Sequence, residues 1–376
     1  MVDQHLTLTA LVVGIVLLIP LLYTSQFKGW IRSAQSNTGL LSLLRRRRPT
    51  QSSEIVSLYM YPIKSCRGFQ VQATTLRQHG LDLDRRWMLV DASSREFLTI
   101  RQIPDMTRIG TGLSDDGLEL VITIPRQSIE GSESSLLHTV RIPAHPSLEW
   151  LAANTTPAPV KIWDTDTDGY IYGDEVNAAF SEFLGRPVAL AYKGPTPRVL
   201  KGNGNPRILG RVQTTNFPDV HPVLIASDSS LTELNTRLRR AEVDPITVER
   251  FRPNIVVRGG TPWSEDSWKL VRIHSRNPDK SGSGSESGSA ISVPIDLDIV
   301  ARCARCQVPN VDPDTAFKHK KQPWDTLVSY RRVDEGIKYK PCFGMLSAPR
   351  NEGVVEVGMR LEVLEETTEH RYITGF

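Results

Sequence analysis

Short apolar runs separated by turn-forming residues dominate the chain after residue 53. Serine, glycine and charged residues interrupt them, as at 93–94 and 114–117. Runs of this length that are rich in Val, Ile, Thr and Tyr are typical of β-strands bounded by turns. The pattern predicts strands at residues 54–63, 69–76, 86–92, 118–124 and, after a polar serine-rich loop at 126–137, at 139–142.

Helical spacing appears only beyond this β-rich beginning. Residues 175–184 have the spacing of a helix, with Asp174 suited to the N-cap position and Gly185 followed by Pro187 to end it. A second helix is predicted at 229–241, where leucines recur on one face.

The remaining body contains further short strands and two long loops. One loop, residues 194–211, is rich in glycine, proline and basic residues, and the other, residues 275–289, is a flexible Gly/Ser-rich insertion. Strands are predicted at residues 160–163, 222–227, 254–257, 268–273, 291–301 and 362–364. Short strands with two or three inserted helices indicate an α+β architecture based on a β-barrel, and not a doubly wound sheet.

The N-terminal run from Leu6 to Phe27 contains 22 uncharged residues. As a helix it would reach about 33 Å, enough for a hydrocarbon core of about 30 Å. A cleaved signal peptide would need a basic start and a small-residue cleavage site, whereas the first five residues carry only Asp3 and His5 as ionisable side chains. The sequence therefore predicts a single membrane-spanning helix, and a buried core helix is the alternative.

The charge is unevenly distributed along a chain whose 39% hydrophobic and 23% charged residues indicate a folded protein. Of the net +3, residues 1–27 carry −1 and residues 28–48 carry +6, which leaves −2 for residues 49–376. The positive-inside rule then predicts that residues 28–376 face the cytosol. The arginine run at 45–48 either touches anionic headgroups or belongs to a solvated linker, and no nucleic-acid partner is expected.

The four cysteines, Cys66, Cys303, Cys306 and Cys342, are too few for a secreted disulfide framework. They agree with a reducing compartment. The cytosol is such a compartment, and the charge distribution also predicts that residues 28–376 face it.

Cys303 and Cys306 form a CxxC motif. Zinc is disfavoured because a structural site needs four ligands at paired spacings. A thioredoxin-like dithiol is disfavoured because prolines soon after the motif oppose a helix. Two interpretations remain: two buried structural cysteines, or one thiolate that ligates a soft, high-valent metal within a cofactor, with Arg302 and Arg305 lowering the thiol pKa.

Residues 164–175 match the calcium-loop pattern D-x-D-x-D-G-x5-E at every position. An EF-hand also needs an entering helix, which Pro157, Pro159 and the strand-like residues 160–163 oppose. The alternatives are a calcium loop and an acidic surface turn that leads into a helix capped by Asp174.

The loop at 194–211 carries the glycine pair Gly202 and Gly204, which is a weak phosphate-binding signal. Its basic residues are Arg198, Lys201, Arg207 and Arg211. They predict either a cationic lid or an ordinary flexible surface loop. The common sequence signatures of hydrolases and nucleoside-triphosphate enzymes do not occur.

Four ordered segments resemble the signature set of MOSC-domain proteins. They are Tyr61–Gly68, Asp84–Trp87, Phe251–Val257 and the stretch from Cys303 to Thr315. Together with the N-terminal apolar run, they are most similar to the mitochondrial amidoxime-reducing component group. The resemblance covers roughly residues 54–365.

The resemblance implies a MOSC β-barrel core, preceded by a MOSC-associated β-rich region, that binds molybdenum cofactor. The expected division is an anchor and tether at 1–50, the N-terminal β-barrel region at 54–193 and the MOSC domain at 194–376. Cys306 is implied as the metal ligand and catalytic residue, because a thiolate suits a metal already bound by dithiolene sulfurs. The implied cofactor-binding residues are Lys64, Ser65, Arg85, Asp219, Arg252, Asn254, Ala304 and Arg305.

The activity implied by the resemblance is the reduction of N-hydroxylated compounds such as amidoximes, hydroxylamines and N-oxides. Cytochrome b5 and its NADH-dependent reductase are the expected electron donors, and the loop at 194–211 is the expected contact with the acidic haem protein. The expected location is the outer mitochondrial membrane, anchored through residues 6–27, with the catalytic part in the cytosol. Pyridoxal phosphate binding is a further expectation from the resemblance.

Two other functions stay open. One is a carrier or sulfur-relay protein of cofactor maturation without turnover, which the anchor and the lack of an aminotransferase-like domain disfavour. The other is a membrane-tethered thiol or zinc protein built on Cys303 and Cys306.

The chain departs from the family pattern at two places. At Asp219–Pro222, relatives carry a hydroxyl-rich turn, so Asp219 carries over better than His221. Leu346 stands where an aromatic hydroxyl is expected, which predicts one fewer cofactor contact.

Overall fold

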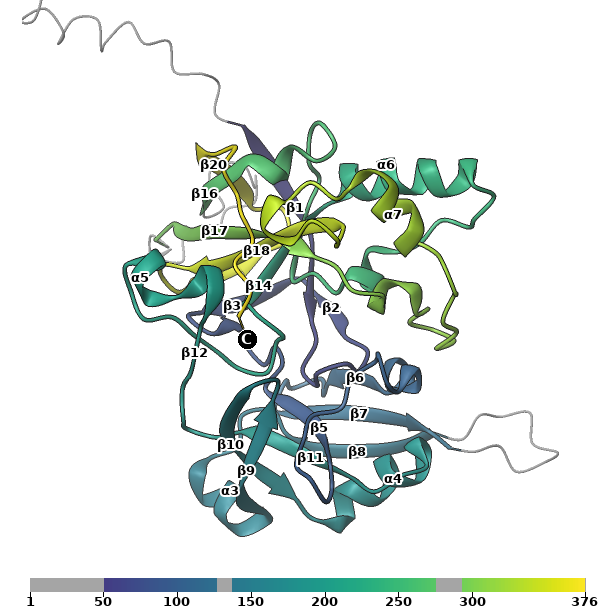
Figure 1. The fold of residues 1–376 in the computed structure, drawn as a ribbon. Coiled ribbons are helices and arrows are strands. Elements are labelled where there is room, and N and C mark those ends of the chain that lie inside the picture. The colour runs from purple at the N-terminus through teal and green to yellow at the C-terminus, as the bar shows by residue number, and fades with distance from the viewer. Residues whose placement is uncertain (1–50, 127–136, 275–292, 376) are drawn as a thin grey trace, which may run out of the picture. The chain divides into compact units, whose positions relative to one another are not determined.

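Seven strands close into a β-barrel in the computed structural model, which describes residues 51–126, 137–274 and 293–375. Around the barrel the order is β15-β14-β18-β17-β16-β20-β1, and β1 pairs again with β15. The bounds are β1 (Ser52–Met60), β14 (Val223–Ser227), β15 (Ile255–Val257), β16 (Trp268–His274), β17 (Ile295–Ala304), β18 (Cys342–Pro349) and β20 (Arg360–Glu366). The first described strand thus completes a barrel of strands from the second half of the chain (Figure 1).

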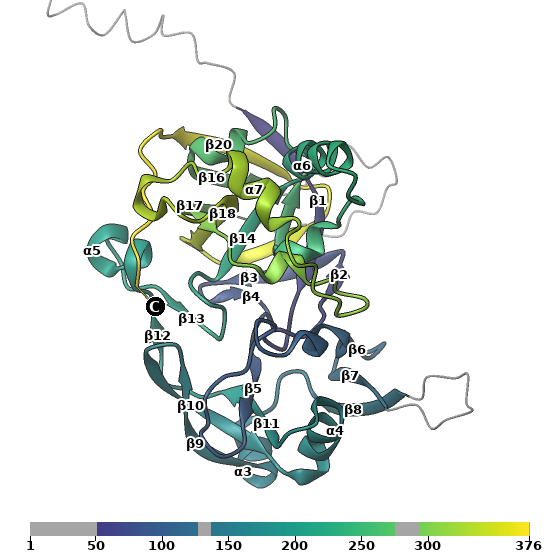
Figure 2. The ribbon, with the colours of Figure 1, turned by 45° about the vertical axis from the view of Figure 1, so that its right-hand side comes forward.

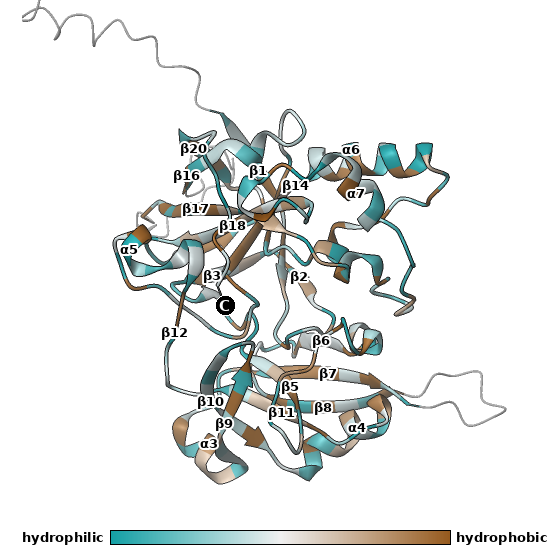
Figure 3. Cartoon of the chain, viewed as in Figure 1, coloured by the Kyte–Doolittle hydropathy of each residue, from teal (hydrophilic) through white to brown (hydrophobic). Residues whose placement is uncertain are grey.

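Alternating side chains fill the barrel. In β17, Ile295, Leu297 and Ile299 are buried while the residues between them are partly exposed, as expected where successive side chains point to opposite faces. Helix α6 (Asp228–Arg240) packs its leucines in one cluster with Ala226 of β14. Figure 3 shows the apolar strands of the barrel and the mainly hydrophilic surface of α6.

Two smaller sheets form the region that precedes α6 in the sequence. One has the order β5-β11-β10-β9 and the other the order β6-β7-β8 (Figure 2). Their bounds are β5 (Trp87–Asp91), β6 (Gly110–Leu113), β7 (Glu119–Pro125), β8 (Leu137–Pro143), β9 (Thr155–Ile162), β10 (Thr165–Tyr172) and β11 (Val188–Lys193). Helix α4 (Asp174–Leu184) contacts both sheets through β7, β10 and β11.

The remaining elements are short. A third sheet joins β3 (Ala73–Arg77), β4 (Gly80–Leu81) and β19 (Gly353–Glu356), and so connects the two ends of the described chain. The others are β2 (Phe69–Val71), β12 (Arg198–Val199), β13 (Thr214–Thr215), α3 (Leu148–Asn154), α5 (Pro206–Leu209) and α7 (Trp324–Tyr330).

Most predicted strands and both predicted helices are present, which confirms a β-barrel-based architecture. Several boundaries were wrong. The run predicted at 69–76 is two strands separated at Gln72, and Gly173, not Asp174, occupies the N-cap of α4. The strand predicted at 160–163 begins at Thr155 and includes two prolines, which β9 tolerates because it lies at the edge of its sheet.

Two central strands were missed by the sequence interpretation. Both β11 and β18 are buried along their whole length. A strand buried on both faces shows no alternation of apolar and polar residues, so periodicity cannot distinguish it from a buried helix segment, although the equally buried β14 was predicted from its apolar run.

The calcium-loop hypothesis is wrong, and so is the alternative of an acidic turn. The acidic segment forms β10 and pairs with β9 from Thr165 to Tyr172. In this strand Asp166 and Asp168 share one face, but an extended chain spaces them about 7 Å apart, so the carboxylates are spread along the strand and do not wrap around one ion. Asp168 instead pairs with Lys193 at 3.3 Å and accepts hydrogen bonds from Thr196.

Some predicted segments lie outside the described residues. These are the membrane span at 6–27, the basic tether, most of the loop at 126–137 and the insertion at 275–289. Within the ranges that the structure describes, no helix is long and apolar enough to cross a membrane.

Candidate functional site

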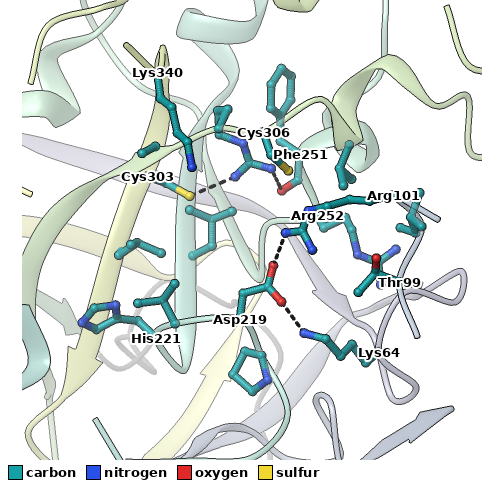
Figure 4. A pocket seen from close by; sticks show the side chains of 18 of the residues that line it. Lys64, Thr99, Arg101, Asp219, His221, Phe251, Arg252, Cys303, Cys306 and Lys340 are labelled. Carbon is teal, nitrogen blue, oxygen red and sulfur yellow. Dashed lines mark hydrogen bonds and ion pairs between the residues drawn. The ribbon is translucent and has the colours of Figure 1, made fainter. Parts of the chain in front are cut away.

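All nine residues expected to bind the cofactor line one pocket. Figure 4 labels four of them, Lys64, Asp219, Arg252 and Cys306. The nine residues come from five separate segments of the chain. Lys64 and Ser65 follow β1, Arg85 precedes β5, Asp219 precedes β14, and Arg252 and Asn254 precede β15. Ala304 ends β17, and Arg305 and Cys306 follow it. The barrel and the β5 sheet thus supply neighbouring walls of the same pocket.

Three of these residues adopt a left-handed backbone conformation. Their φ angles are 71° for Ser65, 47° for Arg85 and 58° for Arg252. This region is uncommon for residues other than glycine and is typically held in place by the surrounding structure at functional sites. Arg85 is held in this way because its backbone N–H donates to the carbonyl of Tyr61 at 2.9 Å.

Asp219 is the carboxylate at the centre of the pocket. It forms ion pairs with Lys64 and, at 2.7 Å, with Arg101 (Figure 4). Although burial acts in the opposite direction, these two cations hold the pKa of Asp219 well below its usual range. Burial lowers the pKa of Lys64 to about 8, and Asp219 only partly offsets that effect. Both groups are therefore charged near neutral pH.

Arg85 and Arg252 both lie over the ring of Tyr61, at 4.4 Å and 4.3 Å from its centroid. Asp84 accepts two hydrogen bonds from Arg85 at 2.7 Å each. Arg85 donates to the carbonyl of Arg252, and Arg252 donates to the carbonyl of Cys66. Burial and the neighbouring Arg85 lower the pKa of Arg252 to about 10. Two cations are thus held side by side, which is favourable only with an anion nearby.

Asn254 and Ser65 already make hydrogen bonds to the main chain. The Asn254 side chain accepts from the N–H of Leu224 at 3.1 Å and donates to the carbonyl of Tyr59 at 3.4 Å. The Ser65 hydroxyl accepts from the N–H of Ile100 and can still donate its own proton. The structure therefore shows a structural role for Asn254, and its contact with a pterin stays a prediction.

The two cysteines of the CxxC motif have different surroundings, because Arg101 interacts with the side chain of Cys306 and Arg305 lies against Cys303. Arg305 donates to the Cys303 sulfur at 3.0 Å and to the carbonyl of Phe251 at 2.9 Å. Burial nevertheless raises the pKa of Cys303. Arg302 does not line the pocket, because it pairs with Asp334 at 3.5 Å and donates to the carbonyl of His370. The expectation that Arg302 and Arg305 together lower a thiol pKa is therefore wrong for Cys303.

The pocket carries an excess of positive charge. Its lining includes six basic residues and one carboxylate, Asp219. The basic residues are Lys64, Arg85, Arg101, Arg252, Arg305 and Lys340. Buried charges of one sign are costly unless they are paired. The arrangement suits an anionic ligand, with the Cys306 thiol available to a soft metal.

Sequence reasoning missed Arg101 as a lining residue and set His221 aside in favour of Asp219, whereas the structure places all three in the pocket lining. Arg101 lies after a short apolar run and matches no motif. His221 is 5% exposed, and neither ring nitrogen has a hydrogen-bond partner among the described residues. Burial, and then the charge of Arg198, lowers its pKa to about 3, so the ring is neutral. Leu346, the position of the expected missing hydroxyl, also lines the pocket.

The loop at 194–211 is more structured than expected of a lid. Arg198 is buried and donates to the carbonyls of Asn216 and Pro218, while Arg211 pairs with Asp298 at 2.6 Å. Only Lys201 and Arg207 remain as its exposed basic side chains. Half of its predicted cationic surface therefore serves the fold.

The described part of the chain contains no group of three or more His, Cys, Asp or Glu side chains placed to hold a metal ion by themselves. Cys66 and Cys342 are buried and do not line the pocket. A zinc site built from protein side chains alone has no support in these regions.

Comparison with known proteins gives consistent matches. Residues 52–187 match the family described as "MOSC N-terminal beta barrel domain", and residues 212–362 match the "MOSC domain" family. The chain is 29% identical to mitochondrial amidoxime reducing component 2 of Macaca fascicularis, over 84% of each chain. It is also 29% identical to mitochondrial amidoxime-reducing component 1 of Mus musculus, over 84% of this chain and 83% of that protein. Molybdenum cofactor sulfurase of Oryza sativa subsp. japonica is 32% identical over 77% of this chain and 32% of its own length.

Proposed function

Because the chain belongs to the MOSC-domain proteins, with a MOSC N-terminal beta barrel domain followed by a MOSC domain, we propose that it binds molybdenum cofactor and reduces N-hydroxylated compounds. The convergence of nine residues from five separate segments on one cation-rich pocket is the observation that carries this proposal. The relatives named as amidoxime-reducing components support the reaction.

The residues of the pocket fit an anionic, metal-bearing cofactor. Lys64, Arg85 and Arg252 would hold the phosphate, because charge-assisted hydrogen bonds to phosphate are the strongest that these side chains make. Each of the three also donates to a main-chain carbonyl and is therefore already positioned. Binding would add a negative charge to a group of cations in which Lys64 pairs with Asp219 and Arg85 pairs with Asp84.

Cys306 would be the protein ligand to molybdenum. Cys306 lines the pocket two residues after the end of β17, where its side chain interacts with Arg101, whereas the Cys303 sulfur accepts a hydrogen bond from Arg305. The bound cofactor supplies two-electron chemistry at the metal, and the protein supplies position and electrostatics. We assign the binding of the anionic cofactor to the basic side chains, and the orientation of Cys306 to its position just after β17.

The proposed reaction removes one oxygen atom from nitrogen. Two electrons and two protons enter, the N–O bond breaks, and the oxygen leaves as water while the amidoxime becomes an amidine. The sequence carries no flavin, nicotinamide or haem motif. The electrons are therefore proposed to come singly from cytochrome b5, which is re-reduced by its NADH-dependent reductase.

We propose the outer mitochondrial membrane as the location. The relatives named as mitochondrial proteins and the apolar run at 6–27 with the positive charge that follows it support this placement. The catalytic part would then face the cytosol, where it can meet its electron donors.

The experiment is expression of the full chain in a host that makes molybdenum cofactor, followed by measurement of molybdenum per chain and of benzamidoxime reduction with NADH, reductase and cytochrome b5. We expect close to one molybdenum per chain and donor-dependent turnover. Cys306→Ala should abolish turnover, while the matched variant Cys303→Ala should retain molybdenum and turnover. Protein without molybdenum from such a host would refute the proposal.

A second candidate is a cofactor carrier or sulfur relay without turnover. The similarity to a molybdenum cofactor sulfurase favours it. In that case the full chain would contain cofactor, pass it to a cofactor-free acceptor enzyme and show no amidoxime reduction with any electron donor. Pyridoxal phosphate binding stays a prediction.

A further inference from the structure

The segment Ile337–Lys340 runs from the pocket wall to the surface. Ile337 and Lys340 line the pocket (Figure 4 labels Lys340). Tyr339, between them, is 86% exposed, more than any other large hydrophobic side chain of the described residues. Lys338 and Lys340 are also exposed. We call Lys338, Tyr339 and Lys340 the rim.

The rim belongs to a strongly basic stretch of surface sequence. From residue 318 to residue 340, the exposed acidic residues are Asp325 and Glu335 alone. The exposed basic residues are Lys318, Lys320, Lys321, Arg332, Lys338 and Lys340. None of these six has an ion-pair partner among the described residues, in contrast to Arg331, which is buried and pairs with Asp266.

The chemistry of the rim fits a protein partner. Unpaired lysines create a field that steers an oppositely charged partner toward them. Tyrosine is enriched among the residues that contribute most to binding at protein interfaces, because its ring buries a large area and its hydroxyl keeps a hydrogen-bond partner. An exposed tyrosine between two lysines combines both properties.

We propose that the rim is the docking surface for an acidic one-electron donor protein. This inference rests on the proposed function, because a chain without an electron-carrying motif must receive electrons from a partner. Two successive dockings deliver two electrons, each donor is oxidised by one electron, and together they supply the pair that breaks one N–O bond. The rim is suited to this task because the segment that carries it also lines the pocket.

The loop at 194–211 is the competing surface. Its buried Arg198 and paired Arg211 are engaged within the fold, which leaves Lys201 and Arg207. It exposes Ile208 and Val199 but no aromatic side chain. Electrostatic steering and an aromatic contact therefore coincide at the rim and not at this loop.

The test compares two double variants of the full-length holoprotein. Lys338→Glu/Tyr339→Ser alters the rim without changing Lys340, which lines the pocket. Lys201→Glu/Arg207→Glu alters the competing loop by two charge reversals. The readouts are the binding of oxidised cytochrome b5 by titration, the oxidation rate of reduced cytochrome b5 at increasing ionic strength, and amidoxime reduction driven by dithionite, which needs no protein partner.

The rim variant should bind cytochrome b5 about tenfold more weakly, lose a similar factor in donor oxidation rate and depend less on salt. Its dithionite-driven rate should equal that of the unsubstituted protein, and the loop variant should change less than twofold. The docking proposal is overturned if the loop variant loses as much as the rim variant, if neither loses binding, or if the rim variant also loses dithionite-driven turnover.

Two further outcomes separate this inference from other possibilities. If the unsubstituted protein shows no dithionite-driven turnover, the proposed function fails, while the titration still decides whether the rim binds the cytochrome. If the rim variant loses binding to anionic phosphatidylserine vesicles but keeps its affinity for cytochrome b5, the rim is a membrane contact and the docking proposal is overturned.

Discussion

The cations of the pocket wall and the cations of the exposed stretch 318–340 have the same charge but opposite environments. Four of the six cations that line the pocket donate a hydrogen bond to a main-chain carbonyl, and we call these four the wall cations. These cations are Lys64, Arg85, Arg252 and Arg305. The exposed cations have no ion-pair partner among the described residues and keep their hydration. The wall is therefore built to hold a charge at a fixed position, whereas the exposed stretch can only attract one from a distance.

This difference explains why the net charge of the chain says little about its ligand. The formal charge is only +3, yet the pocket lining has six basic residues against one acidic residue. The anionic ligand is selected by a local excess of positive charge in the pocket, which acidic residues elsewhere in the protein nearly balance. The predictions below test whether the wall and the exposed cations really differ in this way.

The largest effect is expected from removing Asp219, the only carboxylate among the described residues that line the pocket. Asp219→Asn should destabilise the cofactor-free protein by about 3 kcal/mol, because Lys64 would remain buried without its counter-ion. We place the effect at the low end of the range for buried pairs, since the Asp219 side chain is 36% exposed. The measurement is urea unfolding of cofactor-free protein.

Asp219→Asn should lower the free energy of unfolding less in the cofactor-loaded protein, because the bound anion would neutralise the cations of the pocket. Asp325→Asn, on the exposed stretch, is the matched control and should change stability by less than about 0.5 kcal/mol. Equal effects of the two substitutions would show that the wall is not electrostatically distinct.

A pH effect of intermediate size is expected at His221. Its pKa is about 3 in the folded protein because of burial and the charge of Arg198, against an ordinary value near 6.5. The unfolded chain therefore takes up a proton between these values while the folded protein does not, and stability is lost as the pH falls through this window.

His221→Phe should reduce that loss. Between pH 7 and pH 5, the decrease in the free energy of unfolding should be smaller than in the unsubstituted protein by about 2 kcal/mol. His138→Phe is the control, because His138 is partly exposed and contacts Arg126 and no carboxylate among the described residues. An unchanged pH dependence in His221→Phe would mean that the wall tolerates another positive charge.

A smaller effect, on the binding of the cofactor, is expected from removing Arg252, one of the residues proposed to hold its phosphate. Arg252→Met keeps much of the side-chain volume but removes the guanidinium that lies over Tyr61. We expect molybdenum per chain to fall about tenfold under limiting cofactor, which corresponds to about 1.4 kcal/mol. Arg332→Met on the exposed stretch should leave the molybdenum content unchanged, and an equal fall in both variants would contradict a positional role for Arg252.

Much of this comparison could be predicted from the sequence. The motif segments contain Lys64, Arg85, Arg252 and Cys306, and the structure places these residues on one pocket as a set. Arg101 could not be found, because it matches no motif and only the folded chain brings it to Asp219, and His221 was set aside in favour of Asp219. The sequence also could not show that Arg198 is buried while Arg207 is exposed, because both arginines lie in the same glycine- and proline-rich loop.

For the fold, too, only part of the structure could be predicted from the local sequence pattern. Alternating strands such as β7 were predicted because one side of each faces the core. The buried strands β11 and β18 were missed for lack of alternation. At β10 a specific motif was misleading, because the spacing of carboxylates along a sequence has a different meaning in a strand than in a loop.

The smallest effect is expected at an exposed cation and tests the other side of the comparison. Lys320→Gln should change the free energy of unfolding by less than about 0.5 kcal/mol, because Lys320 has no partner among the described residues to lose. Molybdenum content should also stay constant. Lys64→Gln, the same substitution in the wall, removes a buried amine that bonds Asp219 and the carbonyl of Phe217, and should lower both quantities measurably. If Lys320→Gln lowered them as much as Lys64→Gln, position in the wall would not be what makes a lysine part of the site.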